Sequence, residues 1–198
     1  MEQPFPTIVS ATQTPLAARL TAPETQGVSH ELARLGAGLG LAALYGLALG
    51  ARSGGLSLVQ HALGASAGLA AVGVLGMPSL FVLLALVNAP VSPSAMLSAG
   101  ARSLASTGFV LAGLAPSAAL LAVTIESPDA AAFVTRAGLT LAGGIGLFQL
   151  TSAVSAMLAQ LPPQSRLKCN ALLFGFSLFA IMLAARVWYA LPILKGAA

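Results

Sequence analysis

Charged side chains are so sparse in this 198-residue chain that they divide it into long uncharged stretches. A helix needs about 20 mainly apolar residues, within a range of about 17–25, to cross the apolar core of a bilayer. Charged residues make up only 7% of the chain, against about 25% in soluble domains, and so few cannot cover a water-facing surface. We therefore predict that lipid surrounds most of the chain. The uncharged stretches are residues 35–51, 53–101, 103–125, 137–165 and 169–185.

The second stretch is too long for one span. Residues 88–94, Asn-Ala-Pro-Val-Ser-Pro-Ser, combine two prolines with three polar side chains, which indicates a turn. Residues 58–87 before this turn would form about 45 Å of helix, which exceeds an apolar core of about 30 Å.

Pro78 lies inside that segment, and a proline removes a backbone donor, so a kink or a break is expected there. We favour a short interfacial piece at 57–62 followed by one kinked span at about 63–87. The alternative is a span that ends near Leu75 and a re-entrant half-helix at 79–87.

The sequence thus predicts an all-α integral membrane helical bundle of about five transmembrane helices. Residues 1–30 are polar and contain several prolines, and we interpret them as a flexible, disordered aqueous tail. Ser29 suits the N-cap of the first span, Pro128 suits the first position of the fourth, and Pro162 ends the fourth. Residues 31–198 form one membrane domain, with spans at about 32–50, 63–87, 103–124, 131–159 and 169–190.

The nine basic residues are shared almost equally between the two sides of such a bundle. Five lie on the side of the amino terminus and four on the other, which places the amino terminus in the cytoplasm by the positive-inside rule. Because the basic residues are scattered singly near span ends, they suit phospholipid headgroups, and nucleic acid is not an expected partner. The two sets are Arg19, Arg34, Arg102, Arg166 and Lys168, and Arg52, Arg136, Arg186 and Lys195.

Small residues recur at four-residue spacing within the spans. In lipid, helices associate where small side chains let two backbones approach closely, so we predict helix-packing contacts at such positions. Pro78 and Pro116 are the expected kinks. The small-residue pairs are Gly36/Gly40, Gly46/Gly50, Gly64/Gly68, Gly138/Ala142 and Ala180/Ala184.

Gly64-Ala65-Ser66-Ala67-Gly68 matches the G-x-S-x-G pattern of hydrolases. That pattern works where a strand turns sharply into a helix and exposes the serine, whereas this segment is helical throughout. His61 lies five positions before Ser66, about 140° around a helix, so the two side chains do not face each other. We therefore interpret Ser66 as part of a tight helix crossing, with its hydroxyl bonded back to its own helix.

Other polar residues give no sign of a reactive centre. We interpret His61 as an interfacial side chain and Glu126 and Asp129 as acids that stabilise a helix start. Cys169 is the only cysteine, which excludes an intramolecular disulfide. Gln149 and Arg186 are among the few polar side chains within the spans, and this scarcity argues against ion-coupled transport. We expect no catalytic residue, no cofactor and no metal.

The order of short motifs over residues 40–195 resembles a family of small bacterial polytopic inner-membrane proteins of unassigned function. Yip-type five-span membrane proteins are similar in general layout. The chain departs from the family pattern at Gly76-Met77 and at residues 190–193, so the resemblance implies a multi-pass protein of the bacterial inner membrane and carries over no active site. The motifs are Tyr45-Gly46 with Leu49-Gly50, Leu58-Val59-Gln60-His61-Ala62, Pro78-Ser79-Leu80, Leu114-Ala115-Pro116 and Leu191-Pro192-Ile193.

These features favour a non-enzymatic membrane subunit that anchors or assembles a larger complex, because small-residue faces occur without a buried network of charges. Its partners would be the lipid bilayer and other membrane protein subunits. The alternative is a channel or a carrier of lipids or small solutes, formed by an oligomer, because two spans contain a proline. An intramembrane enzyme is not expected.

Overall fold

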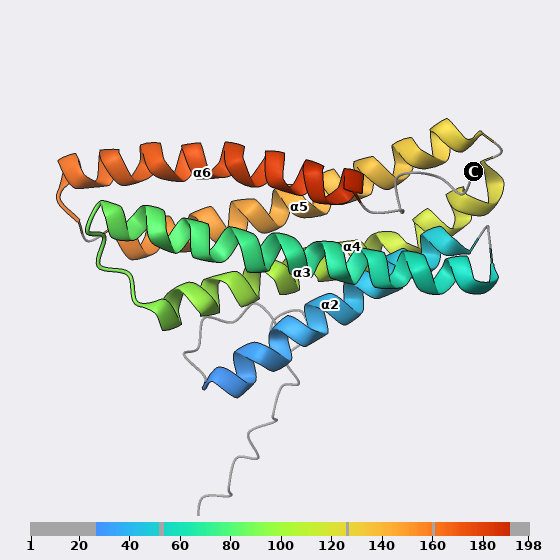
Figure 1. Cartoon of the computed structure of the whole chain (residues 1–198), viewed down its shortest axis with the longest axis horizontal. Helices are drawn as coiled ribbons and strands as arrows, with labels where there is room; N and C mark the ends of the chain where they lie inside the picture. Colours follow the sequence, from blue (N-terminus) through green and yellow to red (C-terminus); the bar gives the residue numbers. More distant parts are fainter. Residues whose placement is uncertain (1–26, 52–53, 126, 160, 191–198) are drawn as a thin grey trace, which may run out of the picture.

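The computed structural model describes residues 27–51, 54–125, 127–159 and 161–190. These residues form five α-helices and no strand, so the predicted all-α fold is confirmed (Figure 1). Residues 1–26 of the predicted tail, Glu126 and the motif at 191–193 lie outside the described residues. The helices are α2 (Val28–Gly50), α3 (Gly55–Leu86), α4 (Pro93–Thr124), α5 (Pro128–Leu158) and α6 (Pro163–Ala190).

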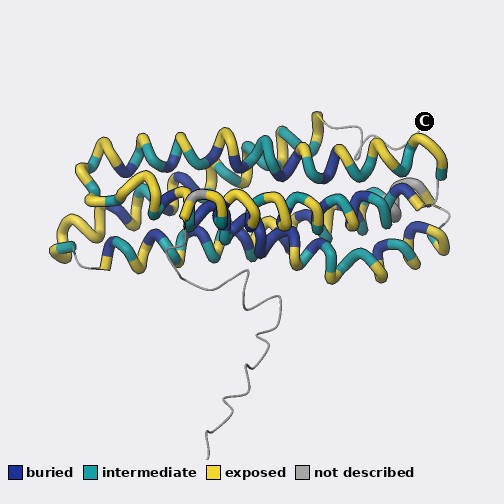
Figure 2. Tube along the Cα trace, turned by 90° about the horizontal axis from the view of Figure 1, so that it is seen from below, coloured by how far each residue is buried: buried dark blue, intermediate teal, exposed yellow. Residues whose placement is uncertain are grey.

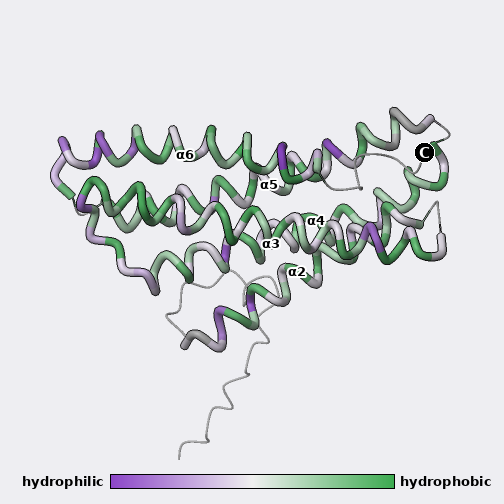
Figure 3. The backbone as a smooth tube through the Cα atoms, viewed as in Figure 1, coloured by the Kyte–Doolittle hydropathy of each residue, from purple (hydrophilic) through white to green (hydrophobic). Residues whose placement is uncertain are grey.

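Each of the five helices is long and apolar enough to cross a membrane. The mean hydropathy of their most apolar stretches ranges from 1.5 in α5 to 2.3 in α3. Phe148, Leu120 and Phe174 are 68–72% exposed on the outside of the bundle, and hydrophobic residues extend along all the helices (Figure 3). Such side chains are unfavourable in water and suit contact with lipid. The chain is a multi-pass helical membrane protein.

The helices α3 to α6 run side by side along the long axis of the molecule, and α2 crosses them obliquely (Figure 1). Buried residues collect on the inner sides of the helices (Figure 2). One cluster, around Tyr45 and Leu111, joins α2, α3, α4 and α5. A second cluster, around Leu84, Val154 and Phe176, joins α3 and α4 to α5 and α6 at the other end.

Helix α3 is one continuous helix of 32 residues from Gly55 to Leu86, with Pro78 inside it. Residues 57–62 are therefore not a separate piece of helix, and the alternative of a span that ends near Leu75 followed by a re-entrant half-helix at 79–87 is wrong. A helix that stopped at Pro78 would leave several backbone groups without partners in lipid, whereas a continuous helix loses only one hydrogen bond. The hydroxyl of Ser79 also donates to the carbonyl of Leu75 at 2.8 Å. Pro116 likewise lies within the continuous helix α4.

Helices also begin earlier than the sequence predicted. Helix α4 begins at Pro93, where Ser92 accepts a hydrogen bond from the backbone N–H of Ala95 at 3.2 Å, and not at residue 103. Helix α6 begins at Pro163 and not at residue 169. The predictions covered only the apolar core, while polar first turns with a proline at the first position extend the helices beyond it. Helix α2 is capped by Gly27, and not by Ser29.

Candidate functional site

Helices α2 and α4 cross in close backbone contact. An added Cβ on Gly38 would lie 2.8 Å from the Cα of Ala105, and one on Gly108 would lie 2.8 Å from the Cα of Gly38. Both distances are far below the 3.5–4.0 Å at which carbon atoms attract best. The two backbones therefore touch here, and only glycine fits at either position.

Helix α2 also packs closely against α3. An added Cβ on Gly46 would lie 2.7 Å from the Cα of Ala62, and one on Gly50 would lie 2.7 Å from the Cα of Leu58. The hydroxyl of Ser66 lies 3.0 Å from the carbonyl oxygen of Leu39 in α2 and 3.2 Å from that of Ala62 in its own helix. These contacts place Gly46, Gly50 and Ser66 at one helix crossing.

The other predicted packing residues are in contact in some cases and exposed in others. Gly64 and Gly68 are buried in α3, and Gly138 lies against the ring of Tyr45. Gly36 and Gly40 are exposed on α2 and have open space around them, so they do not take part in the crossing. Gly38, which lies between them, is the residue in contact, because the opposite face of α2 turns toward α4.

Hydroxyl groups join α4 to α5. Ser103 donates to the carbonyl of Gly146 at 2.7 Å, and Ser106 donates to the side-chain oxygen of Gln149 at 2.6 Å. Thr107 donates to the carbonyl of Ser103 at 3.0 Å and lies against Gly146. The side-chain oxygen of Gln149 therefore has its partner on the neighbouring helix.

The described contacts do not bring a base to Ser66. Nδ1 of His61 lies 2.7 Å from the carbonyl oxygen and 3.2 Å from the hydroxyl of Ser57, one turn earlier in α3. The hydroxyl of Ser66 meets two carbonyl oxygens instead. Within the described part of the chain, no group of three His, Cys, Asp or Glu side chains could hold a metal ion.

A buried ion pair lies at the start of α2, and the sequence did not indicate it. Glu31 and Arg34 are 4% and 3% exposed, and their charged atoms are 3.4 Å apart. Ser98 of α4 donates to a carboxylate oxygen of Glu31 at 2.9 Å. A buried charge requires partners of this kind, so the pair helps to fix α2 against α4.

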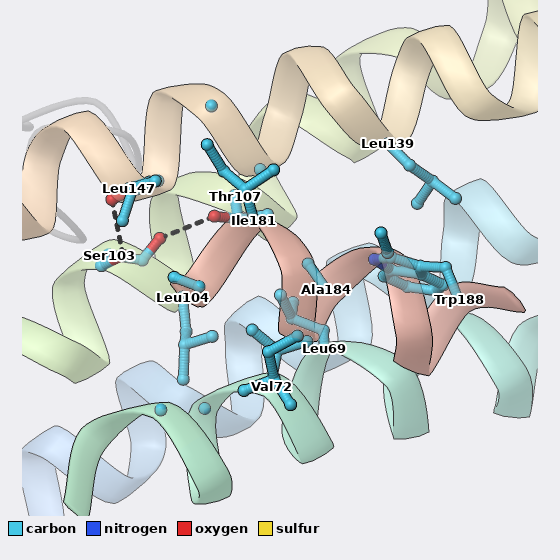
Figure 4. Close-up of a pocket in the computed structure, with 18 of the residues that line it drawn as sticks. Leu69, Val72, Ser103, Leu104, Thr107, Leu139, Leu147, Ile181, Ala184 and Trp188 are labelled. Carbon is cyan, nitrogen blue, oxygen red and sulfur yellow. Dashed lines mark hydrogen bonds between the residues drawn. The ribbon is translucent and has the colours of Figure 1, made fainter. Parts of the chain in front are cut away.

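A cleft of about 500 Å³ lies between α3, α4, α5 and α6 (Figure 4). Ligand pockets typically measure about 300–1,000 Å³. The wall from α3 contains Leu69, Val72, Gly73 and Gly76, whose spacing is that of one helix face. The wall from α5 contains Gly143, where an added Cβ would have nothing within 4 Å.

The walls of the cleft offer few free polar atoms. Ser103 and Thr107 line it, but both hydroxyls are already hydrogen-bonded to carbonyls. Arg136 is the one charged side chain among the described lining residues, and Thr140 lies one turn further along α5. The cleft is therefore apolar over most of its length and basic at one place.

Helix α6 covers the cleft and contacts the bundle loosely. Its buried residues are Cys169, Leu173 and Phe176, all in its first half. Beyond Phe176, small side chains such as Ala180 and Ala184 line the cleft, and Trp188 contacts the cluster around Tyr45 at the far end. Phe176 and Trp188 thus mark the two ends of the cleft.

No family model, curated protein or solved structure matches this chain. The predicted membership of the bacterial inner-membrane family therefore stays a prediction, and the function is inferred from the cleft and the helix crossings.

Proposed function

We propose that this multi-pass membrane protein is non-enzymatic and binds an apolar ligand, such as a lipid chain, in the cleft between α3, α4, α5 and α6. The observation that carries this proposal is the cleft itself, with about 500 Å³ of space and almost wholly apolar walls. A ligand site is typically a pocket of this size with a small number of polar groups. The carrier of lipids or small solutes that the sequence left as the alternative agrees with this site.

The loose contact of α6 supports the same proposal. Of the most apolar stretch of α6, only 11% is buried, against 28% in each of the other helices. The buried residues of α6 all lie in its first half, so its second half can move away from the bundle at a small free-energy cost. A ligand could then enter from the surrounding lipid without leaving the membrane.

Photolabelling tests this proposal directly. A long-chain alkyl probe that carries a diazirine is added to the purified protein in a mild detergent, and the labelled peptides are identified by mass spectrometry. We expect saturable labelling of residues in the cleft, with a large decrease in Ala184→Phe, which fills it. The control is Ala171→Phe on the exposed face of the same helix. Equal labelling of all outer faces, with no effect of Ala184→Phe, would contradict the proposal.

We further propose that the protein assembles with another membrane subunit through the outer face of α2. Leu32 and Leu44 are exposed, and Gly36 and Gly40 between them have open space around them. The four residues follow one another at intervals of four along one stripe of α2. A small-residue stripe of this kind permits close approach of a helix from a partner.

Purification from the native host in a mild detergent tests the assembly. We expect partner proteins in a fixed ratio with the parent chain, and their loss with Gly36→Leu, while Gly113→Leu on an exposed face of α4 retains them. Repeated recovery of the chain alone would count against this second proposal.

We place the protein in the bacterial inner (cytoplasmic) membrane with its amino terminus in the cytoplasm. The family resemblance supports the membrane, and the excess of basic residues on the amino-terminal side, five against four, supports the orientation. Accessibility of a cysteine introduced into the loop between α4 and α5 to an impermeant reagent in intact cells tests the orientation. Labelling from outside is expected, and its absence in a chain shown to be folded would reverse the orientation.

A further inference from the structure

We propose that the cleft takes a single-chain lipid with an anionic headgroup, whose headgroup contacts Arg136 and whose chain extends along the cleft toward Phe176. This inference rests on the proposed function, since it identifies the ligand of the same cleft. Its basis is the unequal chemistry of the two ends of the cleft.

One end of the cleft is basic. Arg136 is the only charged side chain among the described residues that line it. The ion pair of Glu31 and Arg34 is the only one among the described residues, so no described carboxylate neutralises Arg136. A guanidinium donates paired hydrogen bonds to a carboxylate or a phosphate, and Thr140 adds a hydroxyl one turn away.

The same end carries the two aromatic residues that suit a membrane interface. Trp188 and Tyr189 of α6 line the cleft together with Arg136 of α5, because α6 ends beside the first half of α5 (Figure 1). Tryptophan and tyrosine are enriched at the depth of lipid headgroups. A headgroup that contacts Arg136 would therefore lie beside Trp188 and Tyr189.

The other end of the cleft is apolar. Phe176 is 2% exposed and packs with Leu80, Leu84 and Leu173 in a continuous hydrophobic cluster. Between the two ends the walls contain leucine, glycine and alanine, as Figure 4 shows around Leu69, Leu147 and Ala184. An alkyl chain fits this stretch, and a second charged group would find no partner in it.

The chain contains its own reporter for this site, because Trp188 is its only tryptophan. In nanodiscs of phosphatidylcholine, we would measure the quenching of Trp188 by a fatty acid brominated near its head, and by the corresponding fatty alcohol. The variant Ala184→Phe supplies the background from bulk lipid. The acid should quench the fluorescence of Trp188 saturably. It should bind the parent at least about tenfold more tightly than the alcohol, because a hydrogen bond to a charged group contributes at least this factor to an affinity.

Replacement of Arg136 gives the second arm. Arg136→Gln should remove the preference for the acid and leave alcohol binding unchanged, and Arg136→Lys should retain part of it. The control is Arg186→Gln. It also removes a positive charge, near Trp188 in the last turns of α6, but Arg186 is not among the residues that line the cleft. Equal affinity of the parent for acid and alcohol, or an unchanged preference in Arg136→Gln, would contradict the contact between the headgroup and Arg136. Binding of the alkyl chain in the cleft would not be contradicted by either result. If neither ligand quenches saturably, the proposed function fails as well.

Discussion

Helices α2 and α6 lie at opposite sides of the bundle in Figure 1 and pack in opposite ways. The most apolar stretch of α2 has a lower mean hydropathy than that of α6, 1.6 against 1.9, yet 28% of this stretch is buried in α2 and only 11% in α6. The backbone of α2 touches α4 at Gly38 and α3 at Gly46. Helix α6 instead passes over a cleft. Alanines stand there, whereas close packing would require either glycines that let the backbones touch or larger side chains that fill the space.

This difference shows that hydrophobicity does not decide contact inside a membrane. Lipid chains are as apolar as leucine, so the burial of apolar surface gives two helices no reason to associate. Association follows where backbones can approach and where polar groups find partners. Helix α2 offers both, through Gly38 and through the bond from Ser66 to Leu39, and α6 offers neither beyond Phe176.

The largest effect is expected at the ion pair of α2. Arg34→Met leaves the buried carboxylate of Glu31 without its partner, and the loss of one member of a buried pair destabilises by about 3–5 kcal/mol. The measurement is the free energy of unfolding in mild detergent. The matched control, Arg186→Met on the exposed end of α6, should change it little. A comparable loss in both variants would mean that α2 is no more tightly packed than α6.

The next effect concerns the glycines at the crossing of α2 and α4. Gly108→Leu forces a side chain into the backbone of Gly38, and overpacking of this kind costs about 1–3 kcal/mol, occasionally more. Gly175 of α6 has open space around it. Gly175→Leu should therefore leave the stability unchanged or raise it slightly, because leucine favours a helix more than glycine does. Thermal stability of the two variants, measured side by side, decides whether the contact of α2 and α4 is real.

A smaller effect on stability is expected when an alanine is replaced by leucine, either in α6 beside the cleft or in α4 at the crossing with α2. Ala184→Leu extends into the cleft and should change stability by less than about 1 kcal/mol, since a penalty for overpacking arises only where no space exists. Ala105→Leu, at a residue of α4 that is 0% exposed against α2, should be clearly less stable. Chemical denaturation of both proteins gives the comparison, and an equal loss would argue that α6 closes the cleft.

The smallest effect is expected at Ser66. Ser66→Ala removes the hydroxyl that meets the carbonyl of Leu39, and hydrogen bonds between helices in a membrane average about 0.6 kcal/mol. Ser79→Ala removes a hydroxyl that bonds only within α3 and should lose less. The difference is measurable as a shift of the unfolding midpoint. A loss of several kcal/mol in Ser66→Ala would indicate that the hydroxyl does more than join two helices.

The sequence predicted the number of helices and the order of the spans, because charged residues mark where the chain meets water. Helices α3, α4 and α6 begin before the predicted spans, since hydropathy locates the apolar core and not the polar turns that continue a helix beyond it. Pro78 misled for a related reason. In lipid, a continuous helix with one missing hydrogen bond is more stable than an interrupted one.

The packing was less predictable than the spans. Glycines of α2 occur on both of its faces, and the sequence alone does not tell which face meets a partner, so Gly36 and Gly40 were chosen where Gly38 makes the contact. The ion pair of Glu31 and Arg34 depends on a neighbour 67 positions away, Ser98. One signal for the cleft was present: glycines at 143, 144 and 146 remove side chains from one part of α5.

The length of α3 and α4 has a consequence for the membrane around the protein. Each has 32 residues, or about 48 Å of helix, whereas the 23 residues of α2 give about 35 Å. An apolar core of about 30 Å matches α2 with a modest tilt. At the steep end of observed tilts, about 40°, α3 and α4 still span about 37 Å. The 31 residues of α5 give about 46 Å of helix, so hydrophobic mismatch acts on α3, α4 and α5. These three helices are walls of the cleft, so a change in bilayer thickness acts on the ligand site.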